Sequence, residues 1–187
     1  MTRRRTVVAM MLLIFAVAAC KKEGGAAGAP GASSLSKYPG TEEGAKQLLP
    51  EIRGSDAKAM TLALRPTSAD YKAVFTDDVA GKLEEAYAKL WSDPNAVIGA
   101  DPANTELALW KATSEELQQW TGEASANFPG GYKRVAAKLK PGLVVYRWKY
   151  VKPGETAGMA YDGLIHVNGR WSWYPKPWRM MGGDGGE

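Results

Sequence analysis

The sequence feature that most constrains the fold is a turn dipeptide, Asn168-Gly169, placed between two apolar segments, residues 159–167 and 170–174. Asn-Gly is the strongest short-range signal for a two-residue β-hairpin, because both residues tolerate the positive φ angles of such a turn. A two-residue loop fixes how the strands pair, and opposed residues share a face. Both predicted faces carry large apolar groups, so we expect the hairpin to be covered on both sides. One face is predicted to hold Asp162, Leu164, His166, Trp171 and Trp173, and the other Tyr161, Ile165, Val167, Ser172 and Tyr174.

Upstream of the hairpin the periodicity changes from helix to strand. Residues 144–150 alternate apolar and charged side chains, which predicts a third strand, and residues 106–111 are a further candidate. Apolar residues at helical spacing predict the remaining elements, with Pro50 expected to shorten or kink the first helix. These predicted helices cover residues 41–52, 55–65, 67–75, 78–92, 113–122 and 132–139. Helices followed by strands indicate an α+β fold, with N-terminal helices packed on a C-terminal antiparallel sheet.

The closing segment Tyr161–Trp171 (YDGLIHVNGRW) is similar to the last hairpin of NTF2-like, or cystatin-like, domains. The resemblance covers about residues 40–180 and is architectural. It implies a cone in which N-terminal helices pack into a curved sheet, and a pocket that NTF2-like enzymes often line with an acid–base pair. The chain departs from the minimal cone in the helical stretch between Glu106 and Lys140, which leaves the strand order open.

The first twenty residues have the layout of an export signal. Three arginines at positions 3–5 precede an apolar run of eleven residues, Val7–Val17. That length suits a signal-peptide core, whereas a spanning helix needs about 20 residues. The run ends in Val17-Ala18-Ala19-Cys20, which resembles the lipobox of bacterial lipoproteins. The resemblance implies cleavage before Cys20 and acylation of its thiol; an ordinary secretory signal and an uncleaved anchor are the alternatives.

Removing residues 1–19 nearly neutralises the chain. Lys plus Arg falls from 24 to 21, against 20 Asp plus Glu, which leaves a net charge of about +1. A nucleic-acid partner is not expected, because the basic footprint is lost with the signal. The implied N-terminal lipid would give stable membrane attachment. By the same resemblance, Lys21 after the cysteine implies sorting to the periplasmic face of the outer membrane in a Gram-negative host.

The predicted domain organisation follows from composition. Residues 1–19 are the signal peptide, and residues 20–37 are the acylated cysteine with a flexible Gly/Ala/Ser-rich linker. A single globular domain covers residues 38–180, and residues 181–187 form a disordered tail. Cys20 is the only cysteine, so the domain must fold without disulfides.

His166 is the first candidate for chemistry, because an imidazole titrates near neutral pH and can act as a general base. Asp162 lies four residues earlier on the same predicted face and could complete an acid–base pair. The structural alternative, in which His166 stacks on Trp171, is favoured because no third catalytic partner can be identified. Trp171, Arg147 and Tyr161 complete the candidate pocket.

Seven Trp and eight Tyr form an unusually large aromatic set. Exposed rings could bind a sugar, a peptidoglycan fragment or another planar ligand. The favoured alternative is that wide rings fill a sheet core in a chain with only three Phe. Trp178, which follows Pro175-Lys176-Pro177, is predicted either to cover the domain as a lid or to lie exposed as a contact for an envelope partner.

No metal or cofactor is expected, because the chain has no nucleophile elbow, no phosphate-binding loop and no Cys or His pair at metal spacing.

The sequence leaves three hypotheses for the function. The first is a non-enzymatic envelope lipoprotein that binds a small hydrophobic or aromatic-stacking ligand, or a protein partner. The second is an NTF2-like enzyme of isomerase or hydrolase type that uses His166 and Asp162. The third is a structural accessory subunit of an envelope complex.

Overall fold

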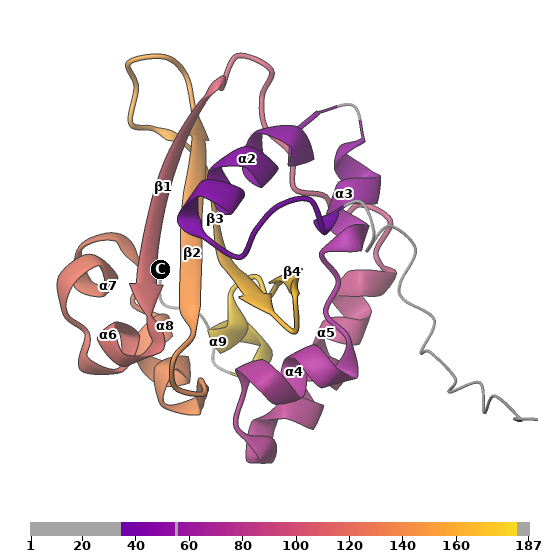
Figure 1. The fold of residues 1–187 in the computed structure, drawn as a ribbon, viewed down its shortest axis with the longest axis vertical. Coiled ribbons are helices and arrows are strands. Elements are labelled where there is room, and N and C mark those ends of the chain that lie inside the picture. The colour runs from indigo at the N-terminus through magenta and orange to yellow at the C-terminus, as the bar shows by residue number, and fades with distance from the viewer. Residues whose placement is uncertain (1–34, 55, 183–187) are drawn as a thin grey trace, which may run out of the picture.

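The computed structural model describes residues 35–54 and 56–182 (Figure 1). Within them an antiparallel sheet is surrounded by helices, so the predicted α+β class is confirmed. The helices are α2 (Glu42–Ile52), α3 (Ala57–Ala63), α4 (Ser68–Val74), α5 (Asp77–Ser92), α6 (Ser114–Gln119), α7 (Gly122–Asn127), α8 (Tyr132–Val135), the 3₁₀ helix η1 (Ala136–Lys138) and α9 (Pro177–Met180). The strands are β1 (Glu106–Thr113), β2 (Val144–Val151), β3 (Gly158–Val167) and β4 (Arg170–Trp173).

The four strands lie side by side in chain order, each antiparallel to its neighbour. The connection from β1 to β2 is long and contains α6, α7, α8 and η1, which gather at the lower left of Figure 1. The hairpin register is confirmed, since Val167 pairs with Arg170 and Leu164 with Trp173. Asn168 and Gly169 both have positive φ angles, 52° and 72°, as this turn requires. The resemblance to the NTF2-like cone stays a prediction.

One face of the sheet, here called the α2 face, packs against α2 and the segment that precedes it. Tyr146, Trp148 and Tyr150 point to this face from alternate positions of β2. The Tyr150 hydroxyl donates to the Leu49 carbonyl of α2 at 2.6 Å. The Trp171 indole N–H donates to the carbonyl of Tyr38 at 3.1 Å, which secures the chain ahead of α2.

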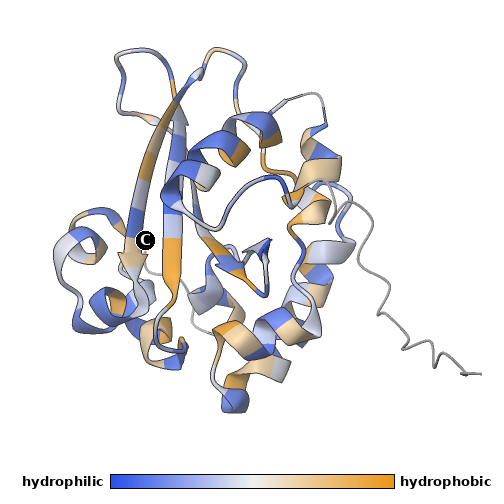
Figure 2. Cartoon of the chain, viewed as in Figure 1, coloured by the Kyte–Doolittle hydropathy of each residue, from blue (hydrophilic) through white to orange (hydrophobic). Residues whose placement is uncertain are grey.

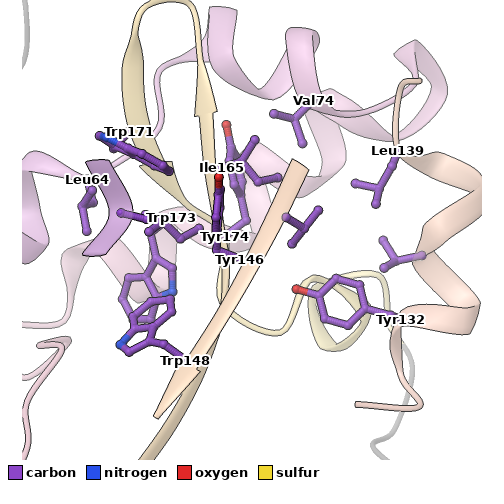
Figure 3. Close-up of a cluster of buried hydrophobic side chains, with 14 of the residues drawn as sticks. Leu64, Val74, Tyr132, Leu139, Tyr146, Trp148, Ile165, Trp171, Trp173 and Tyr174 are labelled. Carbon is purple, nitrogen blue, oxygen red and sulfur yellow. The ribbon is translucent and has the colours of Figure 1, made fainter. Parts of the chain in front are cut away.

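The opposite face, here called the α8 face, is covered by α4, α8 and α9. Val145 and Arg147 point to it from β2, and Ile165 pairs with Val145. Figure 3 shows Trp148, Trp171 and Trp173 on one side of the β2 ribbon and Val74, Tyr132 and Leu139 on the other. The predicted covering of the hairpin on both sides is therefore confirmed.

Aromatic rings make up much of the core. Trp148, Trp171 and Tyr174 are fully buried, and Trp173 packs edge-on against Trp91 of α5 with ring centroids 6.0 Å apart. In Figure 2 the strongly hydrophobic stretches lie in the strands and in the helical turns beside them. The interpretation that the tryptophans of the hairpin fill the sheet core is thus confirmed.

Three of the predicted helix starts are confirmed by side-chain caps. Thr41 accepts a hydrogen bond from the backbone N–H of Gly44. Complete capping boxes open α4, from Thr67 and Asp70, and α6, from Thr113 and Glu116. Pro50 does not end α2, which continues two residues further to Ile52.

The carboxylate of Asp70 also ties α4 to the hairpin. It is 1% exposed and accepts hydrogen bonds from Asn168 at 2.9 Å and from the Arg170 guanidinium at 2.8 Å. Burial by itself raises the pKa of this carboxyl, but the hydrogen bonds from Thr67 and Asn168 and the charge of Arg170 outweigh burial. The pKa of Asp70 therefore ends below its ordinary value.

One predicted boundary and two short helices differ from the sequence analysis. The linker was predicted to extend to residue 37, but Leu35 is 1% exposed and Lys37 pairs with Glu51. One apolar residue in a Gly/Ala/Ser-rich run leaves no periodicity, so composition alone misplaces this boundary. The turns of helix in α7 and α9 were also not predicted, because neither shows a sustained apolar repeat. Cys20 and the signal segment lie outside the described residues, as do residues 183–187.

Candidate functional site

A β-bulge in β3 decides which predicted site residues come together. Arg147 pairs with Asp162, whereas the adjacent Tyr146 pairs with Leu164, so Gly163 is an extra residue in β3. Gly163 has a φ of +84°, and a Cβ at this position would lie 2.0 Å from the Tyr174 carbonyl oxygen. Only glycine fits without a shift of the backbone.

The bulge reverses the alternation of side chains along β3. Asp162 shares the α8 face with Arg147, while Leu164 and His166 point to the α2 face. The predicted common face for Asp162 and His166 is therefore wrong. An uninterrupted two-residue period had been assumed across Gly163, and the bulge breaks that period.

Asp162 lies almost fully inside the protein, with 4% of its surface exposed. Its Oδ1 atom accepts hydrogen bonds from the Tyr132 hydroxyl at 3.1 Å and from the backbone N–H of Lys176 at 3.0 Å. Burial raises the pKa of Asp162, and these two hydrogen bonds and the nearby cations only partly oppose that effect. The surroundings of Asp162 thus disfavour the charged form of its carboxyl group.

Arg147 is the cross-strand partner of Asp162 and is half-buried. One guanidinium N–H donates to the Asn127 carbonyl, and the guanidinium carbon lies 5.2 Å from the centroid of the Trp110 ring. Burial lowers the pKa of Arg147, and the negative charge of Asp162 opposes that change. Among the ion pairs of the described residues, none joins Arg147 to Asp162 within 4.0 Å.

Arg147 and Asp162 both line a hollow of about 400 Å³ on the α8 face. Phe128, Pro129 and Trp178 add an apolar wall, and Lys176 and Arg179 bring two further cations. The full lining is Ala126, Asn127, Phe128, Pro129, Arg147, Ala160, Asp162, Lys176, Trp178 and Arg179. A small molecule in the hollow would meet both a buried carboxylate and a guanidinium.

Trp178 is 4% exposed and forms part of this wall. Its ring packs on Gly131, where a Cβ would lie 2.4 Å from indole carbons, and on Tyr132 with centroids 4.9 Å apart. Of the two predicted positions for Trp178, the lid is the one observed. The exposed contact for a partner is not, because α9 folds the indole back onto α8.

His166 occupies a structural position on the α2 face. Its ring packs edge-on against Trp171 at 5.2 Å between centroids. A Cβ at Gly40 would lie 2.2 Å from its Nδ1 atom, so the backbone passes directly over the ring. Burial lowers the pKa of His166. This is the favoured alternative of the sequence analysis, a histidine stacked on its cross-strand tryptophan.

Tyr161 also belongs to the α2 face, where its ring stacks on Trp148 at 5.3 Å. Its hydroxyl donates to the Gly99 carbonyl at 2.6 Å and accepts from the Gly99 N–H at 3.0 Å. Tyr161 therefore fastens the loop ahead of β1 and lies away from the hollow. Of the predicted pocket residues, the structure brings Arg147 and Asp162 together and separates them from His166, Trp171 and Tyr161.

Tyr132, Lys176 and Arg179 are site residues that the sequence analysis did not single out. Lys176 adopts the left-handed conformation, with φ of 48°, immediately before α9. This conformation directs its N–H at Asp162. The flanking prolines were the available signal for an abrupt change of chain direction.

Within residues 35–54 and 56–182, no group of three His, Cys, Asp or Glu side chains could hold a metal ion. In the same part of the chain, no helix combines the length and the apolar character needed to cross a membrane. No protein-family model, curated protein or solved structure shows a significant match to this chain.

Proposed function

We propose that this chain is a lipoprotein of the bacterial envelope, anchored through Cys20, whose domain binds a small polar ligand in the hollow of the α8 face. The observation that carries the binding role is the unpaired arrangement of Arg147 and Asp162. The two residues are direct cross-strand partners of opposite charge, yet no ion pair joins them. Each is held by hydrogen bonds to other groups, Asp162 by Tyr132 and Arg147 by the Asn127 carbonyl.

The size and chemistry of the hollow support this role. Small-molecule sites enclose about 300–1,000 Å³ and combine an apolar lining with a few convergent polar groups. The hollow of about 400 Å³ has Phe128 and Trp178 as its apolar wall and charged groups of both signs. A buried carboxylate with a raised pKa disfavours folding at neutral pH, and such groups cluster at functional sites.

The geometry gives less support to the two alternatives. The enzyme hypothesis requires His166 and Asp162 in one pocket, and these residues point to opposite faces of the sheet. The accessory-subunit hypothesis requires Trp178 as an exposed contact, and this indole is buried against Tyr132. Neither alternative has a described contact that favours it.

The anchor rests on the lipobox resemblance of Val17–Cys20. We expect radiolabelled palmitate to appear on the expressed protein and the protein to sediment with membranes. Cys20→Ser is expected to abolish both results. Wild-type protein that carries no label and remains in the soluble fraction would refute the anchor.

The binding role can be tested separately from the anchor. The full chain, purified in a mild detergent, is screened by thermal shift against a library of small carboxylates, amines, phosphates, sugars and zwitterions. We expect a subset to raise the melting temperature, and Arg147→Met to remove that increase. His166→Gln, on the opposite face, serves as the control and should retain it. A library with no stabilising compound would count against the binding role.

A further inference from the structure

We infer that the hollow accepts a ligand of the amino-acid type, whose ammonium group lies against Asp162 and whose carboxylate lies against Arg147. This inference rests on the proposed function and names its ligand class. It follows from three features of the lining: a buried acid, an arginine that forms no ion pair with that acid, and an apolar wall.

Asp162 supplies the acidic half of the site. Both described hydrogen bonds to its carboxylate reach Oδ1, from Tyr132 and from the N–H of Lys176. No described hydrogen bond reaches Oδ2. A carboxylate can accept about four hydrogen bonds, so Asp162 retains capacity for a further donor. An ammonium group is the strongest such donor, because it also neutralises the buried charge.

Arg147 supplies the basic half. Its one described hydrogen bond, to the Asn127 carbonyl, uses a single N–H of the five on a guanidinium. The planar fork suits a carboxylate, which it can bind through two parallel hydrogen bonds. Lys176 and Arg179 line the same hollow, and neither forms an ion pair among the described residues. The lining therefore carries three cations against the single carboxylate of Asp162.

The mixture of charges argues against simpler ligands. A plain carboxylate would meet Arg147 favourably but would bring a second negative charge close to Asp162. A plain amine would meet Asp162 favourably but would be repelled by the three cations of the lining. A molecule with both groups on one carbon satisfies both Asp162 and Arg147, and Phe128, Pro129 and Trp178 offer contact to its side chain.

Matched triplets of small molecules test the inference. Leucine is compared with isocaproate, which lacks the ammonium group, and with leucinamide, which lacks the carboxylate. Phenylalanine, hydrocinnamate and phenylalaninamide form a second triplet with a larger side chain. Dissociation constants are measured by calorimetry on the full chain at low ionic strength. We expect at least one amino acid to bind, and each of its two relatives to bind about tenfold more weakly or worse.

Two variants test which residue binds the ammonium group of the ligand and which binds its carboxylate. Asp162→Asn keeps an oxygen acceptor for Tyr132 and Lys176 but removes the charge, so the preference for leucine over isocaproate should disappear. Arg147→Met keeps an unbranched side chain beside Trp110, so the preference for leucine over leucinamide should disappear. Unchanged circular dichroism spectra show that each variant is folded, and His166→Gln should bind all six compounds as the wild type does.

Several results would overturn the inference. If isocaproate binds as tightly as leucine, or if Asp162→Asn leaves leucine binding unchanged, the hollow is a simple anion site. The proposed function would then stand with a different ligand class. If no member of either triplet binds, the amino-acid class is wrong. The library screen described above then decides separately whether the hollow binds any small molecule.

Discussion

Replacing Asp70 with Ala removes the most heavily used carboxylate of the described structure. Its oxygens accept from the Thr67 N–H at 2.8 Å, from Asn168 at 2.9 Å and from Arg170 at 2.8 Å. The Arg170 side chain is only 15% exposed, so its charge would be left without a counterion. Loss of one partner of a buried ion pair costs about 3–5 kcal/mol, and loss of a helix cap about 1 kcal/mol. Because these effects share one carboxylate, we expect a total of about 4 kcal/mol.

The second capping box of the chain provides a matched control. Glu116 accepts from the Thr113 N–H at 2.7 Å in the same local geometry but forms no ion pair within the described residues. Glu116→Ala should therefore cost only about 1 kcal/mol. The two variants isolate what the contacts of Asp70 to Arg170 and Asn168 add to an otherwise equivalent cap.

Urea unfolding followed by tryptophan fluorescence measures the difference. With a slope of about 2 kcal/mol per molar urea, Asp70→Ala should lower the midpoint by about 2 M and Glu116→Ala by about 0.5 M. Adding Arg170→Met to Asp70→Ala should restore part of the loss, because no unpaired charge then remains. Equal midpoints for the two single variants, or no recovery in the double variant, would refute the reasoning.

The lowered pKa of Asp70 also predicts how the stability of the protein depends on pH. The pKa of Asp70 is lowered in the folded protein, so its ionised form stabilises the fold above the ordinary carboxyl pKa of about 4. That stabilisation is lost as the pH falls through the lower, folded value. Asp70→Asn should therefore flatten the loss of stability on acidification below about pH 4. If Asp70→Asn loses stability below about pH 4 as steeply as the wild type does, the pKa of Asp70 is not lowered in the folded protein.

Three further predictions concern the bulge and the two faces of the sheet. Asp162→Asn should raise the melting temperature at neutral pH and leave it nearly unchanged near pH 3. The raised pKa of Asp162 means that its ionised form destabilises the fold, and this form appears only as the pH rises. A lower melting temperature at neutral pH would argue against this prediction. Gly163→Ala should cost more free energy of unfolding than Gly169→Ala. Both glycines have positive φ, for which alanine costs about 1 kcal/mol, but only the Cβ at residue 163 meets a backbone oxygen. Equal urea midpoints for the two glycine variants would show that the close approach is unimportant. His166→Gln should change stability by less than about 1.5 kcal/mol, since its ring makes no described hydrogen bond; complete unfolding at room temperature would show that the stacking on Trp171 matters far more.

Local chemistry explains which parts of the fold could be predicted. The Asn168-Gly169 turn and the capping boxes of Thr67 and Thr113 depend on residues within a few positions of one another. Such signals act in the same way wherever the segment lies in the fold. They are sufficient for the hairpin register, most of the helices and the α+β class.

The candidate site depends on contacts that local patterns do not encode. Gly163 was visible in the sequence, and an isolated glycine in a strand can signal a bulge or a close approach of two backbones. Its effect on Asp162 depends on the Tyr174 carbonyl, which comes from the far side of the hairpin. Lys176 and Arg179 reach the hollow only because α9 turns back over α8. Arg147 and Asp162 were both predicted as pocket residues, but their pairing followed from a register that the bulge creates.

The burial of Leu35 limits how far the domain can stand from a membrane. If the proposed anchor at Cys20 is correct, fourteen residues, 21–34, separate the lipid from the first residue fixed in the core. A chain of that length reaches at most about 50 Å when fully extended. The domain would be confined to a shallow layer above the bilayer, and any molecule that enters the hollow beside Arg147 would be captured within that layer.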